Sequence, residues 1–244
     1  MRIAIRAASI LSTVVLGVVL VSPLSAAETD DANLDIVGKY LNATKTQQNA
    51  LRGAQMEVDI DAKLPKLSKQ GKLRALRFVS TLGKITYKAL GFSGDNTVKQ
   101  EVIARYLSLE TEDRDTSSVA VTPANYKFQL KAVLTQSEQK TYIFQLNPKK
   151  KRVGLFKGEI WLDGATGMPV RESGRWVKSP SVFVKKVEFV QEFALQDGVA
   201  LPSHIESTID THIAGKAELS INFTNFTWQA SDQAGQVDED SPGH

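Results

Sequence analysis

The histidine and carboxylate side chains are the residues of this chain that could hold a metal ion, but their spacing is unsuitable. His204 and His212 lie on one predicted strand, where they share a face with Glu206 and Asp210. At about 3.4 Å per residue the two histidines stand roughly 27 Å apart, too far to ligate one ion. His244 lies in a polar C-terminal segment, and the chain contains no cysteine. The sequence therefore predicts no metal site, no thiol nucleophile and no cofactor.

Two pairs of carboxylates could serve in acid–base catalysis. These pairs are Glu159 with Asp163, and Glu172 with Glu188. Such catalysis needs a cleft and a pair of groups with separated pKa values, and exposed sheet faces carry carboxylates routinely. The chain has no phosphate loop, no dinucleotide fingerprint and no Gly-x-Ser-x-Gly elbow. The sequence predicts a protein that is not an enzyme, with a hydrolase as the least favoured alternative.

A basic run over residues 149–152 is the one feature that suggests an anionic partner. It lies in a tight turn between two predicted strands and has no interleaved aromatic residues. The chain as a whole carries 30 basic and 27 acidic residues, so it has no strong field for a polyanion. The run is interpreted as a solvated hairpin, and no nucleic-acid partner is predicted.

The first 27 residues resemble a cleavable signal peptide. Arg2 and Arg6 precede an uncharged, mostly apolar run over residues 7–21, and Pro23 and the small residues 25–27 follow it. The run is shorter than the roughly 20 residues that a membrane-spanning helix needs, which disfavours the alternative of a retained anchor. Cleavage after Ala27 and export to the periplasm are predicted. Without a cysteine, the mature chain has no site for a lipoprotein anchor.

One helix and a long series of strands must position any functional residues. Ile36, Tyr40, Thr44 and Leu51 recur at helical spacing within residues 28–51. About eleven alternating or extended segments follow, joined by short turns that favour antiparallel pairing; residues 98–109 are included as a long extended piece. The predicted fold is mainly β (α+β): a strongly curved antiparallel sheet, or unclosed β-barrel, with the N-terminal helix packed inside. A single domain over residues 28–230 and a disordered acidic tail over 231–244 are expected.

The inner face of such a sheet is the candidate ligand site. One helix is too small to fill the concavity of eleven strands, and an unfilled apolar concavity suits an acyl chain or another apolar ligand. An ordinary packed core is the alternative for each residue taken alone. The candidate cavity residues are the large apolar side chains of the inward stripes: Phe78, Tyr87, Tyr106, Phe128, Tyr142, Phe144, Ile160, Phe189, Phe193 and Phe223.

Several segments in the second half resemble a known superfamily. The strand at 142–150 ends in Asn-Pro-Lys-Lys, the next at 158–163 ends in Asp, and a Thr with Pro-x-Arg follows at 166–171; Gly-Val-Ala-Leu-Pro stands at 198–202. This order is similar to the periplasmic outer-membrane lipoprotein-sorting (LolA/LolB-like) superfamily. The resemblance implies an unclosed barrel, with short lid helices for which residues 63–71 or 110–122 are the available segments.

The resemblance also implies a function. It suggests a soluble, monomeric periplasmic carrier that shields the acyl chains of a lipoprotein, or another lipid or amphiphile, between an inner-membrane donor and an outer-membrane acceptor. A sensor, regulatory or structural module of the same fold is the alternative. No catalytic residue is implied.

Overall fold

The computed structural model describes residues 26–111, 116–180, 184–196, 198–212 and 215–228. Within them, ten strands form one antiparallel sheet in the order β3-β2-β1-β10-β9-β8-β7-β6-β5-β4, which is open at β3 and β4. The predicted unclosed antiparallel sheet is confirmed. The predicted tail from 231, and the signal segment except for its last two residues, lie outside the described residues. The strands are β1 (Ala54–Leu64), β2 (Lys69–Val79), β3 (Ile85–Gly94), β4 (Tyr126–Gln136), β5 (Gln139–Pro148), β6 (Phe156–Asp163), β7 (Pro169–Trp176), β8 (Val184–Gln196), β9 (Val199–Thr211) and β10 (Lys216–Trp228).

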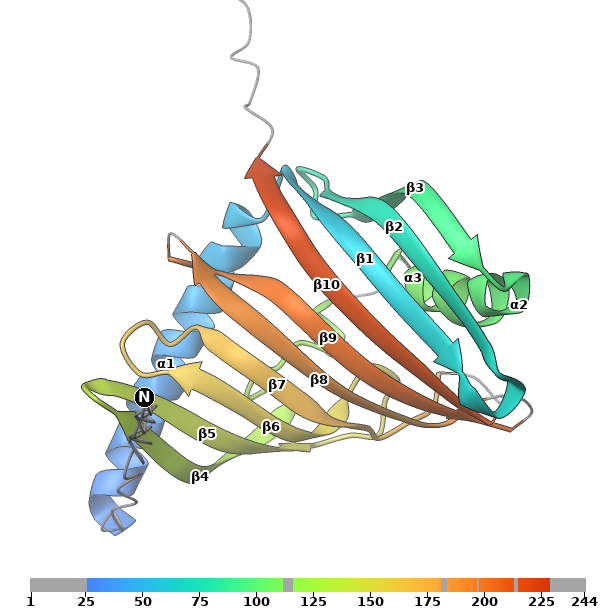
Figure 1. Ribbon diagram of the computed structural model, residues 1–244. Coiled ribbons are helices and arrows are strands. Elements are labelled where there is room, and N and C mark those ends of the chain that lie inside the picture. The colour runs from blue at the N-terminus through green and yellow to red at the C-terminus, as the bar shows by residue number, and fades with distance from the viewer. Residues whose placement is uncertain (1–25, 112–115, 181–183, 197, 213–214, 229–244) are drawn as a thin grey trace, which may run out of the picture.

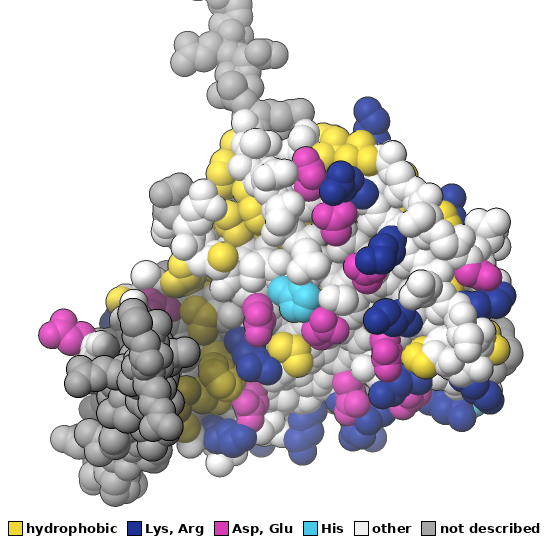
Figure 2. Space-filling model, in the orientation of Figure 1, with side chains coloured by type: hydrophobic (Ala, Val, Ile, Leu, Met, Phe, Trp, Pro, Cys, Tyr) yellow, Lys and Arg dark blue, Asp and Glu magenta, His cyan; other side chains and the backbone are white. Residues whose placement is uncertain are grey.

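Strict alternation of apolar and polar residues gives the sheet two different faces. In β1 the side chains of Met56, Val58 and Ile60 are at most 1% exposed and point inward. The intervening carboxylates point outward, where Asp59 pairs with Arg74 at 3.2 Å. Figure 2 shows this outer face, with acidic and basic side chains interspersed over it. The period-2 pattern thus buries one face and leaves the other wet, as antiparallel sheets permit.

Helix α1 (Ala26–Ala50) crosses the inner face diagonally, as Figure 1 shows. Its Tyr40 ring lies 6.3 Å from that of Phe128 on β4. Near its C-terminus, the Gln47 amide donates a hydrogen bond of 2.7 Å to the Ala200 carbonyl on β9. The helix predicted at residues 28–51 is therefore confirmed, and so is its packing on the inner face.

Residues 98–109, predicted as an extended piece, are helical, and this accounts for ten strands in place of about eleven. The segment comprises α2 (Asn96–Val98), a π-helical stretch η2 (Lys99–Ala104) and α3 (Arg105–Thr111), and it is called the helical cover below. Asp95 caps it by accepting a hydrogen bond of 2.7 Å from the backbone N–H of Thr97. Val98, Val102 and Ile103 are buried against β1 and β2. Their β-branched side chains suggested a strand, but their spacing also places them on one helical face, and burial decided the outcome.

Two short 3-10 turns occupy the segments that were expected to supply lid helices. They are η1 (Pro65–Leu67), between β1 and β2, and η3 (Thr116–Ser118), before β4. Within the described residues these two segments form no further α-helix, although α3 of the helical cover reaches residues 110 and 111, where the second segment begins. The proline at 65 ends β1 because it cannot donate a backbone hydrogen bond, and it favours a tight turn.

The core divides into two clusters at opposite ends of the sheet. One lies between the helical cover and β1, β2 and β10, and includes Ile60, Leu73 and Phe223. The other lies between α1 and β4–β6, and includes Tyr40 and Phe144. The inner face of the middle strands lies between these clusters. None of the helices formed by the described residues is long and apolar enough to cross a membrane.

Candidate functional site

A cavity of about 930 Å³ lies between the helical cover and the inner face of the middle strands. Its walls are largely apolar, and both core clusters end at it. The floor comes from β8, β9 and β10, one wall from the helical cover, and the opposite wall from β7 and the loops beside it. The apolar lining residues are Leu64, Leu67, Val102, Leu109, Trp176, Pro180, Val184, Val187, Phe189, Ile205, Ile209 and Ala217.

The register of the sheet explains why these residues share a floor. Val187 and Phe189 are two apart on β8, so they point to the same face. Their cross-strand partners on β9 are Ile209 and Ser207, which also line the cavity. The Phe189 ring packs edge-on against Phe156, with centroids 5.0 Å apart, and so joins the floor to the cluster beneath α1.

A buried polar network closes the end of the cavity beneath the helical cover. The Arg77 guanidinium on β2 donates a hydrogen bond of 3.1 Å to the Tyr87 hydroxyl on β3 and lies 3.5 Å from the Glu110 carboxylate on α3. Tyr106 donates to Glu110 at 2.8 Å, and Tyr87 also donates to Glu110. These contacts tie the helical cover to β2 and β3 through one carboxylate.

The electrostatics of this network favour the arrangement that the hydrogen bonds show. Burial, followed by the nearby Glu110 carboxylate, raises the pKa of the Tyr87 and Tyr106 phenols, so both remain hydrogen-bond donors. Burial disfavours the charge on Arg77, but Glu110 and the tyrosines outweigh it and raise its pKa. A charged Arg77 with only 13% of its side chain exposed makes this pair far less screened than a surface ion pair.

A second polar group, Glu172 on β7, lies on the inner face close to the cavity. Its cross-strand partners are Ile160 on β6 and Gln191 on β8, and Gln191 lines the cavity. Burial raises the pKa of the Glu172 carboxyl to about 7. Its nearness also contributes to the raised pKa of Tyr126, about 12, for which burial is the main cause. Among the described residues, Glu172 has no hydrogen-bond or ion-pair partner.

The carboxylate pairs considered for catalysis do not form. Glu172 points inward, whereas Glu188 points outward from β8 and pairs with Lys186 at 2.7 Å. Glu159 forms an ion pair with Lys131 on the outer face. Asp163 instead caps the β6–β7 turn, where it accepts a hydrogen bond of 2.8 Å from the Thr166 N–H. Glu172 could have been recognised as unusual from the sequence, because it stands two and four residues before Gly174 and Trp176 on the inward stripe.

His204 and the basic turn have structural contacts on the outer surface. His204 is hydrogen-bonded to Asn222 at 2.8 Å and to Glu206 at 2.9 Å. No cluster of three His, Asp or Glu side chains suited to a metal ion occurs among the described residues. In the basic turn, Lys149 and Arg152 donate to backbone carbonyls of the 118–123 loop. Both ends of this run therefore hold a neighbouring loop in place.

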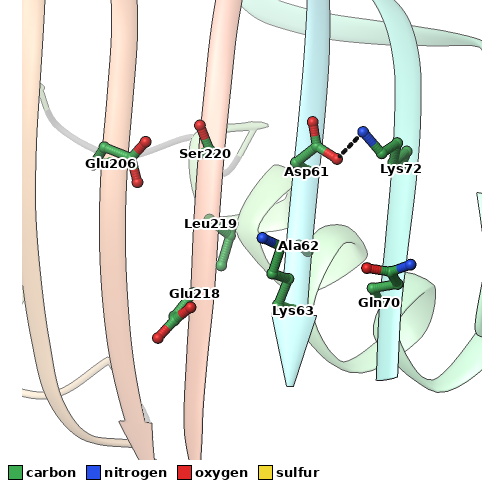
Figure 3. Close-up of a pocket in the computed structure, with 9 residues that line it drawn as sticks. All are labelled: Asp61, Ala62, Lys63, Gln70, Lys72, Glu206, Glu218, Leu219 and Ser220. Atoms are coloured by element: carbon green, nitrogen blue, oxygen red, sulfur yellow. Dashed lines mark ion pairs between the residues drawn. The ribbon is translucent and has the colours of Figure 1, made fainter. Parts of the chain in front are cut away.

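A smaller hollow of about 430 Å³ lies on the outer face, over β2, β1, β10 and β9. Figure 3 shows that charged side chains surround it, with Asp61 and Lys72 joined across two strands at 2.8 Å. Glu206, Glu218 and Lys63 complete a mixed charged surface. This hollow has neither an apolar floor nor a set of groups suited to catalysis, so the inner cavity is the better candidate site.

The structure distributes the predicted cavity residues over several places. Tyr106 and Phe189 line the cavity. Phe128, Tyr142, Phe144 and Ile160 belong to the cluster beneath α1, whereas Tyr87 and Phe223 belong to the cluster beneath the helical cover. Phe78 pairs with Gln55 and Thr86, on the face opposite Arg77, and Phe193 lies at an irregularity in the β8–β9 pairing. Whether any of them contacts a ligand remains a prediction.

The sequence matches no protein-family model and none of the curated proteins at a significant level. Solved structures similar in fold include a LolA superfamily protein from Nitrosomonas europaea (TM-score 0.40, 10% identity) and a DUF1329 family protein from Desulfovibrio piger (TM-score 0.38, 12% identity); each alignment covers 80% of this chain and 94% of the other. The complex of MucA and MucB from Pseudomonas aeruginosa is also similar (TM-score 0.27, 10% identity, 81% of this chain and 100% of the other). A member of the superfamily that the sequence resembles is among these structures.

Proposed function

We propose that this protein is a non-enzymatic carrier that holds an acyl chain of a lipid or lipoprotein in the inner cavity. Cargo is transported or sorted through the periplasm towards the outer membrane, from an inner-membrane donor to an outer-membrane acceptor, by a monomeric protein. The observation that carries the proposal is the apolar cavity of about 930 Å³ on the inner face of β8–β10.

The size and lining of the cavity suit such a ligand. Ligand pockets for small molecules have volumes of about 300–1,000 Å³ and are lined mainly by apolar side chains. Each acyl methylene removed from water contributes about 0.8 kcal/mol, so a chain buried here is held without any covalent step. The described residues around the cavity form no nucleophile–base pair, which is in keeping with binding in place of catalysis.

The edges of the sheet favour the alternative, a sensor, regulatory or structural module. Strands β3 and β4 each pair on one side only within the described sheet. An exposed edge can accept a strand from a partner protein. Under this alternative, binding at an edge would not depend on the cavity.

A charge placed in the cavity distinguishes the two functions. Ile209 lines the floor, whereas its neighbour Thr208 faces outward between Glu188 and Glu218. Ile209→Lys is expected to weaken binding of an uncharged fluorescent fatty-alcohol probe at least about tenfold, because an unpaired ammonium in an apolar site is costly. Thr208→Lys adds the same charge and should leave affinity within about twofold, since it reaches only the outer face.

Circular dichroism and thermal unfolding establish that both variants fold. Saturable binding by wild-type protein, lost in Ile209→Lys and kept in Thr208→Lys, supports the carrier. Wild-type protein that does not bind the probe, or equal binding by both variants, contradicts it.

A further inference from the structure

One row of side chains crosses the inner face of eight strands, and two of its members are polar. Cross-strand pairing places in this row Phe144, Ile160, Glu172, Gln191, Ile205, Ile221, Ile60 and Leu73. The six apolar members are at most 9% exposed. Glu172 and Gln191 are direct neighbours in the row, where cross-strand side chains stand about 5 Å apart. The row thus contains an adjacent carboxylate and amide at positions where all its other members are apolar.

Neither polar side chain is satisfied by the protein. In the part of the chain that the structure describes, Glu172 and Gln191 form no hydrogen bond and no ion pair. Both residues are partly exposed, and their cross-strand pairing with Ile160 and Ile205 places both side chains on the inner face. An unpartnered carboxyl in apolar surroundings destabilises the fold, and burial raises its pKa to about 7. Aliphatic residues at these positions would avoid that cost.

The other charged groups at the cavity already have partners. Glu110 is bound by Arg77 and two tyrosines, and Glu101 pairs with Arg105 at 2.7 Å at the exposed rim. Tyr40 on α1 and Tyr126 on β4 lie near enough to Glu172 for its charge to contribute to their raised pKa values, and both phenols stay neutral. Among the described residues, Glu172 and Gln191 are therefore a carboxylate and an amide near the cavity whose side chains have no partner.

We propose that Glu172 and Gln191 bind the polar head of the amphiphile whose acyl chain occupies the cavity, and that this head carries N–H donors, as a primary ammonium does. The proposal rests on the proposed carrier function. Gln191 lines the cavity directly, and Glu172 is its cross-strand neighbour on the same inner face. A carboxylate and an amide carbonyl both accept hydrogen bonds from an ammonium, whereas a carboxylate or sulfate head would meet like charge.

Alkyl probes with one chain and different heads test this. Dodecylammonium, dodecanol and dodecanoate are made to compete with a fluorescent fatty-acid probe at pH 8, below their micelle concentrations. Wild-type protein should bind dodecylammonium at least about tenfold more tightly than dodecanoate, because a hydrogen bond between charged groups is stronger than a neutral one. Glu172→Gln should reduce this preference to about twofold. Glu188→Gln, which removes an outward-facing carboxylate from the neighbouring strand, should leave it unchanged.

The pH dependence of wild-type binding is a second readout that needs no variant. Below the pKa of Glu172, about 7, the carboxyl becomes protonated and affinity for dodecylammonium should fall by up to about tenfold per pH unit. Affinity for dodecanol should stay constant. Equal affinities for the three heads, or a preference that survives in Glu172→Gln, would overturn the inference while leaving the carrier function intact. Failure of wild-type protein to bind any of the probes would overturn both.

Discussion

Replacement of Glu172 by glutamine should stabilise the protein, and more strongly as the pH rises. In the folded protein burial raises the pKa of this carboxyl from 4.5 to about 7. The folded state therefore binds its proton more tightly than the unfolded state does, so stability is lost as the pH rises through this range. Below pH 4.5 the carboxyl is neutral in the folded and unfolded states, so its charge does not lower the free energy of unfolding. Above pH 7 it is ionised in both states, and the full cost of burying the charge lowers the free energy of unfolding.

The magnitude follows from the difference between the two pKa values. A shift of roughly two and a half units corresponds to about 3 kcal/mol at pH 8, and to under about 1 kcal/mol at pH 5. A glutamine side chain has a similar shape and no charge, so the Glu172→Gln variant should exceed wild type by these amounts. For a chain of this size, about 3 kcal/mol raises the melting temperature by roughly 6–12 °C.

Urea denaturation at a series of pH values between 5 and 8 measures this effect directly. Glu188→Gln serves as the matched control, because Glu188 faces outward and pairs with Lys186 at the surface, where such a pair contributes little. The difference between Glu172→Gln and wild type should grow with pH, whereas that of the control should stay within about 0.5 kcal/mol. Parallel pH profiles for wild type and Glu172→Gln would refute the claim that the carboxyl is buried and unpartnered.

Two further predictions concern the helical cover and the sheet. Glu110→Gln leaves the Arg77 charge without its partner and should lower the free energy of unfolding, measured in urea, by about 3–5 kcal/mol. Glu101→Gln breaks an exposed ion pair on the same helical cover and should lower it by under about 1 kcal/mol. Equal losses in the two variants would show that the buried network does not hold the helical cover in place. Gly158→Ala should prevent normal pairing of β6 with β7, because its Cβ would lie 1.9 Å from the Ser173 carbonyl oxygen. In the Gly38→Ala variant the added Cβ on α1 meets no atom within 4 Å, so this substitution should be neutral or stabilise the fold by up to about 1 kcal/mol. Similar melting temperatures for Gly158→Ala and Gly38→Ala would contradict the close approach of β6 and β7.

The sheet could be predicted from the sequence because its signal is local and repeated. Met56, Val58 and Ile60 alternate with charged residues, and period 2 fixes which side of the strand each residue occupies. Short turns then allow only antiparallel neighbours. One such turn joins β2 to β3, where Gly83 adopts a positive φ of 81° that other residues rarely take. The alternation of apolar and polar residues, together with the short turns, therefore predicted an open antiparallel sheet.

The helical cover could not be predicted in the same way. Val98, Val102 and Ile103 fit an extended run and a helical face equally well, and intrinsic preference favoured the strand. The capping hydrogen bond from Thr97 to Asp95 and burial against β1 and β2 settle the matter only in three dimensions. Because the cover was assigned to other segments, the end of the cavity that it closes could not be located either.

The sequence did not indicate which residues of the inner face line the cavity. An apolar inner face was predicted, but aromatic residues such as Phe144 pack beneath α1, and aliphatic residues such as Ile209 line the cavity. Which residues pack against a helix depends on where that helix crosses the sheet, and the sequence does not specify the crossing. Glu172 was considered only as a partner for Glu188, although its spacing from Gly174 and Trp176 was a sequence signal for the inward direction that its register with Ile160 shows.

The central claim, that the inner cavity holds an acyl chain, is tested most directly by native mass spectrometry of the protein purified from its native cells without detergent. The account predicts that the intact protein carries an additional mass, that denaturation releases it as a lipid or lipidated species, and that Ile209→Lys purified in the same way lacks it while Thr208→Lys retains it. A wild-type protein that appears only at the mass of its polypeptide, and stays so after incubation with lipid vesicles, would contradict the account.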